Sequence, residues 1–445
     1  MENKNKSKSS KINLSQLVLL GLGSLIGSGW LFGAWEASSI AGPAAIISWI
    51  IGFIVIGTIA YNYIEIGTMF PQSGGMSNYA QYTHGSLLGF IAAWANWVSL
   101  VTIIPIEAVS AVQYMSSWPW EWAKPMGALM KDGSISTIGL FAVYVIIAIF
   151  SLLNYWSVKL LTSFTSLISV FKLGVPLLTI IMLMISGFDT NNYGHSASAF
   201  MPYGSAPIFA ATTTSGIIFS FNAFQTIINM GSEIKNPEKN IARGIAISLT
   251  LSAILYIVLQ STFITSMPSS MIHEHGWNGI NFNSPFADMA ILLGINWLAI
   301  LLYVEAVVSP FGTGVSFVAV TGRVLRAMEK NGHIPKFLGK MNEQYNIPRV
   351  AIVFNAIISM IMVTLFRDWG TLAAVISTAT LVAYLTGPTT VISLRKMAPK
   401  MTRPFKANIL KFMAPLSFVL ASLAIYWAMW PTTAEVIFII ILGLP

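Results

Sequence analysis

Apolar runs of about twenty residues recur along the whole chain, and they restrict the folds that it can adopt. About twenty apolar residues in a helix span the hydrocarbon core of a bilayer, which is about 30 Å thick. Of the 445 residues, 55% are hydrophobic and 9% are charged, whereas a soluble domain carries about 25% charged residues. The sequence therefore predicts an all-α polytopic membrane protein, embedded in a lipid bilayer.

The positions of these runs predict about twelve transmembrane helices. We expect spans at 14–40, 43–70, 87–115, 136–156, 159–187, 208–232, 240–265, 285–322, 350–366, 369–394 and 411–430. The last run, 434–443, is too short to cross a bilayer by itself. We therefore expect helix 11 and a truncated helix 12 within 411–445, and a disordered, basic, cytoplasmic N-terminus at 1–13.

The basic residues test this count of spans. With the N-terminus inside and the spans alternating, twenty lysines and arginines fall in inside segments and three fall outside, at Lys124, Lys131 and Arg367. Cytoplasmic loops carry such an excess of Lys and Arg. The pattern predicts a multi-pass protein of the cytoplasmic membrane with its N-terminus in the cytoplasm. The net charge of +8 then reflects loops that face anionic lipid, and no nucleic acid partner is expected.

The residue types present exclude several kinds of chemistry. The chain has no cysteine, so disulfides and thiolate metal sites are excluded. The ionisable residues inside the spans are scattered, without the nucleophile and base that an enzyme needs. The sequence lacks the Gly-x-x-x-x-Gly-Lys-Ser/Thr loop of ATP-driven pumps. We expect no catalytic residue, no metal site and no cofactor.

The stretch GLGSLIGSGWLFG, from Gly21 to Gly33, places five glycines inside the first span, although glycine weakens a helix. A dinucleotide-binding fingerprint is excluded, because Ile26 stands at its third glycine position and no strand precedes it. Two interpretations remain. Small residues four apart favour close helix packing. Alternatively, the helix is broken near Gly27–Gly29, and its free backbone groups bind a ligand at the middle of the bilayer.

A transporter built from inverted repeats requires a second broken helix five spans later. The sixth span, TSGIIFSFNAFQTIINMGSE, carries Ser220 and Asn222 near its centre. Polar side chains at this depth usually face protein or water. This span has no central glycine, so a break is less evident here. A hydrogen bond from Ser220 back to its own helix is the alternative interpretation.

Four motifs follow one another along the chain: GSLIGSGWLFG, IEIGTMFPQSGGMSNYAQY, FSFNAFQTIINMGSEIKNPEKNIARGI and GRVLRAMEKNGHIPKFLGKMNEQYNIPRVAI. Together they resemble the amino acid–polyamine–organocation permeases, from Leu14 past Arg349. The resemblance implies a leucine-transporter-type fold, with inverted five-helix repeats at about 14–187 and 208–394. Two shorter motifs, LLNYWSVK and SPFGTG, are similar to a subgroup that includes bacterial aspartate–proton symporters.

The resemblance implies that the two breaks bind the substrate. In this family, backbone amides of the first break hold the carboxylate of an amino acid, and carbonyl groups of both breaks receive its amino group. The amides map to Gly27, Ser28 and Gly29. The carbonyls map to Leu25, Phe219 and Asn222. Phe219 also matches the aromatic residue that closes over the substrate.

Ser220 and Gln225 complete the predicted substrate-binding set. Gln225 stands where the family often has a glutamate, so any coupling role of that carboxylate is lost. Ala223 stands in place of the motif's usual glycine, which makes the second break less flexible. The assignment of the substrate's carboxylate and amino group to the first break agrees with simple electrostatics. A half-helix N-terminus offers free N–H groups to a carboxylate, and a half-helix C-terminus offers free carbonyls to an ammonium group.

Ionisable residues inside the membrane are costly to insert, so each is a candidate for function. Lys172 in SVFKLGVP lies roughly mid-span, where snorkelling to the surface is difficult but still an alternative. The resemblance implies that this lysine lies close to the first break, where sodium-coupled relatives bind sodium. A desolvated lysine can exchange its proton. Lys172 is therefore the leading candidate for proton coupling.

Two acidic residues are candidates to act with Lys172. Glu305 lies mid-span in LYVEAVVSPFGTG, and Glu107 lies late in its span, toward the outside. Either one neutralises Lys172 or takes part in coupling. The alternatives are a static ion pair and, for Glu107, contact with the outer interface. Glu65 precedes the FPQSGG loop, which we expect it to order.

These features predict a secondary active transporter of amino acids, driven by protons in symport and working by alternating access. An amino acid exchanger and a transporter-fold membrane sensor are the alternatives. The expected partners are an amino acid, protons and the bilayer, and the oligomeric state stays open. Asn222 and Gln225 suit a neutral polar side chain, whereas an acidic side chain needs a cation such as Lys172.

The predicted orientation can be tested by thiol labelling, because the native chain contains no cysteine. Ser7→Cys and Asn342→Cys should resist an impermeant thiol reagent added to whole cells, since both positions are expected in the cytoplasm. Lys131→Cys, expected outside, is the positive control. Labelling of the first two positions in intact cells would contradict the orientation.

Overall fold

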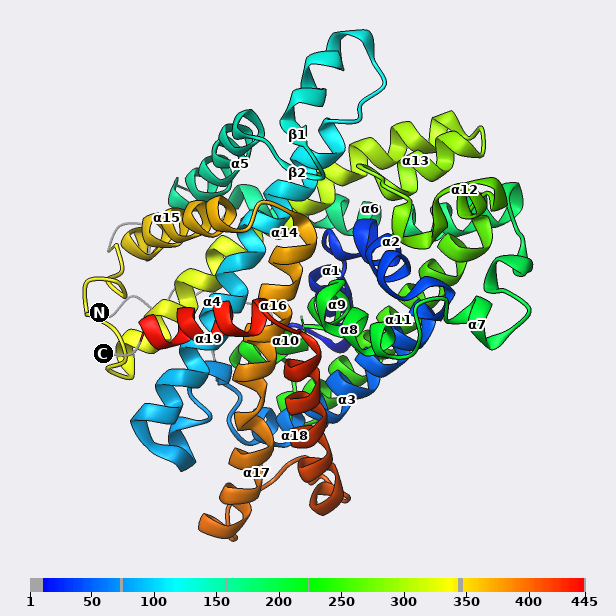
Figure 1. The fold of residues 1–445 in the computed structure, drawn as a ribbon. Helices are drawn as coiled ribbons and strands as arrows, with labels where there is room; N and C mark the ends of the chain where they lie inside the picture. Colours follow the sequence, from blue (N-terminus) through cyan, green and yellow to red (C-terminus); the bar gives the residue numbers. More distant parts are fainter. Residues whose placement is uncertain (1–10, 73–74, 157–158, 223, 343–346, 444–445) are drawn as a thin grey trace.

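The computed structural model describes residues 11–72, 75–156, 159–222, 224–342 and 347–443, with the backbone alone described at 159–170. Helices make up most of this part of the chain and pack into one bundle (Figure 1). Seven helical segments of the described residues are long and apolar enough to cross a membrane, by length and composition. Three lysines of the charge count, Lys4, Lys6 and Lys8, lie outside the described residues, as does Ala223.

The first half of the chain forms the elements α1 to α7. They are α1 (Leu14–Leu25), α2 (Gly29–Ala41), η1 (Gly42–Ala44), α3 (Ala45–Met69), η2 (Gly75–Ser77), α4 (Gln81–Met115), η3 (Glu121–Leu129), β1 (Met130–Lys131), β2 (Ser134–Ile135), α5 (Thr137–Trp156), α6 (Lys159–Ser186), η4 (Thr190–Tyr193) and α7 (Ala197–Phe200). The strands β1 and β2 pair antiparallel in a small hairpin between α4 and α5.

The second half forms the elements α8 to α19. They are α8 (Ala206–Thr214), α9 (Ile217–Phe221), α10 (Phe224–Asn229), η5 (Gly231–Glu233), α11 (Pro237–Ser266), α12 (Ser269–Gly279), α13 (Pro285–Leu292), α14 (Asn296–Lys330), α15 (Arg349–Leu365), α16 (Trp369–Tyr384), α17 (Thr386–Met397), α18 (Leu410–Trp427) and α19 (Thr432–Leu442).

Each predicted span contains one or more of these helices, but the prediction for 285–322 is wrong as a single helix. The chain leaves the helical path between α13 and α14, where Gly294 has a φ of 75°. Glycine adopts this left-handed conformation without steric cost. The second of the two helices, α14, then continues as far as Lys330. A hydropathy pattern records that a segment is apolar and does not show such a short turn.

The centre of the bundle is formed by α4, which packs along α14 and α16 (Figure 1). Nearly all of α4 from Gly89 to Tyr114 is buried. A helix that is apolar on all sides has to lie inside a protein or a membrane. The burial of α4 places its few polar residues inside the protein, where they face the neighbouring helices.

A short backbone bridge connects Ile12, which lies just before Asn13 and α1, to the end of η5, the short helix that follows α10. The N–H of Ile12 donates to the carbonyl of Glu233 at 3.0 Å, and the N–H of Lys235 donates to the carbonyl of Ile12 at 2.9 Å. These two segments are far apart in the sequence. The bridge therefore fixes the start of α1 and the segment after α10 together at one end of the bundle.

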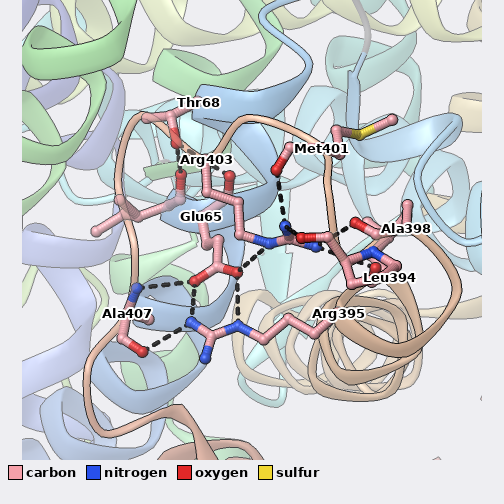
Figure 2. Close-up of polar contacts among 10 residues, drawn as sticks. Glu65, Thr68, Leu394, Arg395, Ala398, Met401, Arg403 and Ala407 are labelled. Atoms are coloured by element: carbon pink, nitrogen blue, oxygen red, sulfur yellow. Dashed lines mark hydrogen bonds and ion pairs between the residues drawn. The ribbon is translucent and has the colours of Figure 1, made fainter.

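Glu65, near the end of α3, is fully buried between two arginines (Figure 2). Nε and Nη2 of Arg395 donate to its two carboxylate oxygens at 2.9 and 2.6 Å. Nε of Arg403 lies 3.4 Å from Oε1 of Glu65, and the N–H of Ala407 donates to Oε2 at 2.8 Å. Glu65 therefore orders the segment between α17 and α18. Its carboxylate has no hydrogen bond to the described part of the FPQSGG loop, which excludes residues 73 and 74.

Glu65→Gln should destabilise the protein, because it removes the charge that compensates two arginines. Breaking a buried pair is strongly destabilising, and Arg395 is partly exposed, so we expect a loss of about 2–3 kcal/mol in the free energy of unfolding. The measurement is thermal unfolding in detergent. Glu121→Gln is the matched control, since its pair with Lys124 is mostly exposed and should contribute little. Equal unfolding midpoints for both variants would contradict the assignment.

Candidate functional site

The first predicted break is present between α1 and α2. Helix α1 ends at Leu25, and Ile26 leaves the helical conformation with φ −90° and ψ 84°. Helix α2 begins at Gly29, with Ser28 as its N-terminal cap. The N–H groups at the start of a helix have no partner inside it. This segment therefore offers backbone donors in the interior of the protein.

The glycines of this stretch have different structural tasks. A Cβ atom on Gly27 would lie 2.6 Å from Oε1 of Glu107, and one on Gly29 would collide with Oγ of Ser220. These two glycines let other groups approach the break. A Cβ on Gly21 would lie 2.9 Å from Oγ of Ser248, so this glycine does allow close packing of α1 against α11. A helix break and close packing therefore both occur in this stretch, at different positions, and ligand binding by the break stays a prediction.

Glu107 binds the backbone of the first break. The N–H of Ser28 lies between its carboxylate oxygens, 3.2 Å from Oε1 and 3.1 Å from Oε2. Negative charge is stabilised at a helix N-terminus. Glu107 is fully buried, so the expectation that it reaches the outer interface is wrong. Helix α4, which carries Glu107, contains Pro105 and continues for ten residues beyond it, to Met115.

The sixth predicted span is interrupted between α8 and α9. Helix α8 ends at Thr214, and Gly216 then adopts a φ of 82° before α9. A Cβ at Gly216 would also lie 2.5 Å from the indole ring of Trp369. The Ser-Gly pair in TSGIIFSF is the sequence signal for this interruption. It lies before the centre of the span, where the break was expected.

Helix α9 ends at Phe221 and α10 begins at Phe224; of the two residues between them, Ala223 lies outside the described residues. The segment around Asn222 is the predicted second break.

The side chain of Asn222 anchors the second break to its surroundings. Its Nδ2 donates to Oγ1 of Thr380 at 2.9 Å and to Oγ of Ser99 at 3.2 Å. Its Oδ1 accepts from the hydroxyl of Tyr384 at 2.6 Å and from Nε2 of Gln225 at 2.7 Å. Helices α4 and α16 thus hold this break in place. Nothing in the sequence distinguishes these hydroxyls from the many others in the spans.

The three predicted carbonyl acceptors already accept hydrogen bonds from the protein. The carbonyl of Leu25 accepts from the hydroxyl of Tyr256 at 2.7 Å. The carbonyl of Phe219 accepts from the N–H of Asn222 at 3.1 Å, and that of Asn222 from Tyr384 at 3.1 Å. The carbonyl of Leu25 also accepts from the N–H of Gly27 at 3.2 Å, and that of Asn222 from the N–H of Gln225 at 3.5 Å. The role of all three carbonyls toward a substrate stays a prediction.

Ser220 bonds within its own helix, as the alternative interpretation proposed. Its hydroxyl donates to the carbonyl of Gly216 at 2.9 Å. The hydroxyl proton is therefore not directed toward a ligand. The side chain instead lies where the two breaks meet, against Gly29.

A small cavity lies between the two breaks. Its volume is about 10 Å³, close to the minimum that holds one water molecule. Its lining residues are Ser24, Leu25, Gly27, Ile103, Glu107, Phe219, Asn222, Gln225, Thr313 and Phe317. The structure thus brings Leu25, Gly27, Phe219, Asn222 and Gln225 of the predicted set to one cavity. Thr313 belongs to the SPFGTG motif, although the sequence did not identify it as a site residue.

Aromatic side chains cover the breaks on the side of α2. Trp369, at the start of α16, donates from Nε1 to Oγ of Ser28 at 3.0 Å. Its ring stacks on Phe32 at 5.0 Å and meets Phe219 edge-on at 6.2 Å, between centroids. Trp369 is almost fully buried. Phe219 therefore contacts both the cavity and an aromatic cluster that closes it.

Lys172 is buried and binds the inner half of the first broken helix. Its Nζ donates to the carbonyl of Gly23 at 2.9 Å and to Oγ1 of Thr313 at 2.6 Å. The snorkelling alternative is therefore wrong. Across the described residues, no ion pair within 4.0 Å joins Lys172 to Glu107 or Glu305. The alternative of a static ion pair is therefore not supported at this distance.

Glu305 is buried without a hydrogen-bond partner in the described part of the chain, at either carboxylate oxygen. Ser309, one turn further along α14, is close to it but lacks the geometry of a hydrogen bond. Thr313, the partner of Lys172, follows one turn later on the same face. Burying a carboxyl group without a hydrogen-bond partner costs free energy. Glu305 therefore stays a candidate for coupling.

A larger hollow of about 690 Å³ lies next to the cavity along α14. Phe317 lines the cavity and Val318 lines the hollow, so α14 contributes to the lining of both. The basic residues that line the hollow are Arg323, Arg326 and Lys330. All three fall in a segment that the charge pattern places inside the cell. The hollow is therefore expected to face the cytoplasm.

Comparisons with known proteins agree with this architecture. The sequence profile of the amino acid permease family matches residues 12–443. The glutamate/serine transporter AimA of Bacillus subtilis is 52% identical over 96% of this chain and 79% of its own length. The aspartate-proton symporter of the same organism is 34% identical over 95% of this chain and 80% of its own. The methylthioribose transporter of Bacillus subtilis is 26% identical over 91% of this chain and 85% of its own length.

The profile covers nearly the whole chain, and two relatives exceed 30% identity over almost all of it. The apolar helices are those of a multi-pass membrane protein. The chain belongs to the amino acid permease family, whose members are membrane transporters and not enzymes.

Proposed function

We propose that this protein is a secondary active transporter that takes up amino acids across the cytoplasmic membrane by proton symport, with its N-terminus in the cytoplasm. Its relatives include a glutamate/serine transporter and an aspartate-proton symporter. Small polar and acidic amino acids are therefore the proposed substrates. The excess of basic residues in the alternate loops supports the orientation.

The observation that carries this proposal is the carboxylate at the first break. Glu107 accepts the hydrogen bond of the Ser28 N–H, at a backbone position that the family resemblance assigns to the substrate's carboxylate. The close approach at Gly27 leaves room for one carboxylate and for no side chain. We expect the carboxylate of an amino acid to replace that of Glu107 on this amide.

Replacement of Glu107 provides a physical reason for coupling to protons. A substrate carboxylate and an ionised Glu107 in one small cavity repel each other, because a low-dielectric interior screens charge weakly. A proton on Glu107 removes this repulsion. Lys172 is the leading group for moving the proton, since it contacts Thr313 in the cavity wall and Gly23 beside the break.

The closed cavity supports alternating access. An amino acid is larger than the space between the breaks, so the wall has to move when it enters or leaves. Phe317 lies toward the larger hollow, and the cluster of Phe219, Phe32 and Trp369 lies on the side of α2. We propose that these two walls open in turn. The division into repeats at 14–187 and 208–394 would then describe the parts that move.

Two other functions stay possible on this fold. An amino acid exchanger would use the same cavity without net proton movement, and a membrane sensor would bind an amino acid without transporting it. Both differ from a symporter in the effect that a proton gradient has on amino acid uptake. Uptake into proteoliposomes therefore separates the three functions.

We predict that Lys172→Ala abolishes uptake driven by a pH gradient and spares binding, because the backbone contacts at Ser28 remain. Lys172→Arg should also fail, since arginine does not release its proton at working pH. Binding and gradient-driven uptake of labelled amino acids are measured on the same purified variants. Lys131→Ala, an exposed lysine in the outer hairpin, is the matched control.

Each result has one interpretation. Concentrative uptake by Lys172→Ala would exclude Lys172 as the coupling group, and Glu107 and Glu305 would be tested next. Uptake by the unaltered protein that requires a trapped internal amino acid would identify an exchanger. Binding without any uptake would identify a sensor.

A further inference from the structure

The amide of Gln225 is held in one orientation by the network around Asn222. In this network Nδ2 of Asn222 donates to Ser99 and Thr380, and its Oδ1 is an acceptor. That oxygen accepts from Tyr384 and from Nε2 of Gln225, at 2.6 and 2.7 Å. Because Nε2 of Gln225 faces an acceptor, its Oε1 has to point elsewhere.

Oε1 of Gln225 has no hydrogen-bond partner in the described part of the chain, and the residue is 2% exposed. A buried acceptor without a donor destabilises the protein. Such atoms are rare in folded proteins, and each requires an explanation. Gln225 also lines the cavity between the two breaks. A ligand in that cavity with a donor group would satisfy this oxygen.

The remaining cavity walls do not favour an anionic side chain. Glu107 contributes a carboxylate, and no lysine or arginine is among the lining residues in the described ranges. Lys172 is not among these lining residues, and its Nζ donates to Thr313, which is one of them. A substrate carboxylate beside Oε1 would set one acceptor against another, whereas a hydroxyl group would donate to it.

We propose that Gln225 determines substrate specificity, by accepting a hydrogen bond from the side chain of the amino acid through Oε1. Substrates with a donor side chain, of which serine is the simplest, are then favoured over acidic ones at this wall. This inference rests on the proposed function of amino acid transport and adds the part of the substrate that Gln225 contacts. Recognition by hydrogen bond discriminates strongly, because the analogue that lacks the donor leaves a buried acceptor unpaired.

The test compares labelled serine and labelled glutamate in proteoliposomes that contain the purified full chain. Gln225→Leu keeps the approximate volume and removes the acceptor. It should raise the KM for serine about tenfold or more and leave that for glutamate within about twofold. Thr390→Val is the matched control. It removes another buried oxygen without a described partner, on α17 outside the cavity lining, and should change neither KM.

Gln225→Glu tests the same contact by its pH profile, and it keeps the inference testable if the leucine variant does not fold. A protonated glutamic acid can donate to Oδ1 of Asn222 and present an acceptor to the cavity, as glutamine does. An ionised one places a charged acceptor against Oδ1. The preference for serine should therefore be restored as the pH is lowered in this variant, whereas it should not follow pH in this way in the unaltered protein.

Four results would overturn the inference. An equal loss for serine and glutamate in Gln225→Leu would mean that Oε1 contacts a group common to all amino acids. A selective loss of glutamate would mean that the amide presents its N–H groups to the cavity. Failure of the unaltered protein to take up serine, while it still takes up glutamate, would refute this inference and leave the proposed function standing. Uptake of no amino acid would refute both.

Discussion

The hydrogen bond from the N–H of Ser28 to Glu107 is the interaction on which the candidate site depends. Backbone groups inside a membrane protein have to be paired, because no bulk water reaches them. A helix broken at this depth is stable only if another element supplies the missing partners. Here α4 supplies a carboxylate, α16 supplies the indole of Trp369 to the Ser28 hydroxyl, and α11 supplies Tyr256 to the carbonyl of Leu25.

The same neighbouring helices hold the second break. Ser99 of α4 and Thr380 and Tyr384 of α16 bind the side chain of Asn222. The two breaks also contact each other, where Gly29 meets Ser220. A movement of either break relative to α4 and α16 would exchange several of these hydrogen bonds at once. Such a network has a small number of discrete arrangements, which is what switching between two open states requires.

Much of the fold and part of the site could be predicted from the sequence. Apolar runs located the helices, and the glycine spacing located the first break, since both depend on nearby residues. The prediction was wrong where the outcome depended on distant ones. The alternative that Glu107 reaches the outer interface was wrong, because its carboxylate is buried against Ser28, which is 79 residues away in the sequence. The left-handed glycines at 216 and 294 divide spans whose hydropathy is continuous.

The central claim is that a substrate carboxylate displaces Glu107 from Ser28 and that Glu107 then takes up a proton. Calorimetric titration of serine in buffers with different ionisation enthalpies measures the protons taken up on binding. The account predicts an uptake of about one proton by the unaltered protein and none by Glu107→Gln, which still binds. Equal proton uptake by the two proteins, or no uptake by either, would contradict it.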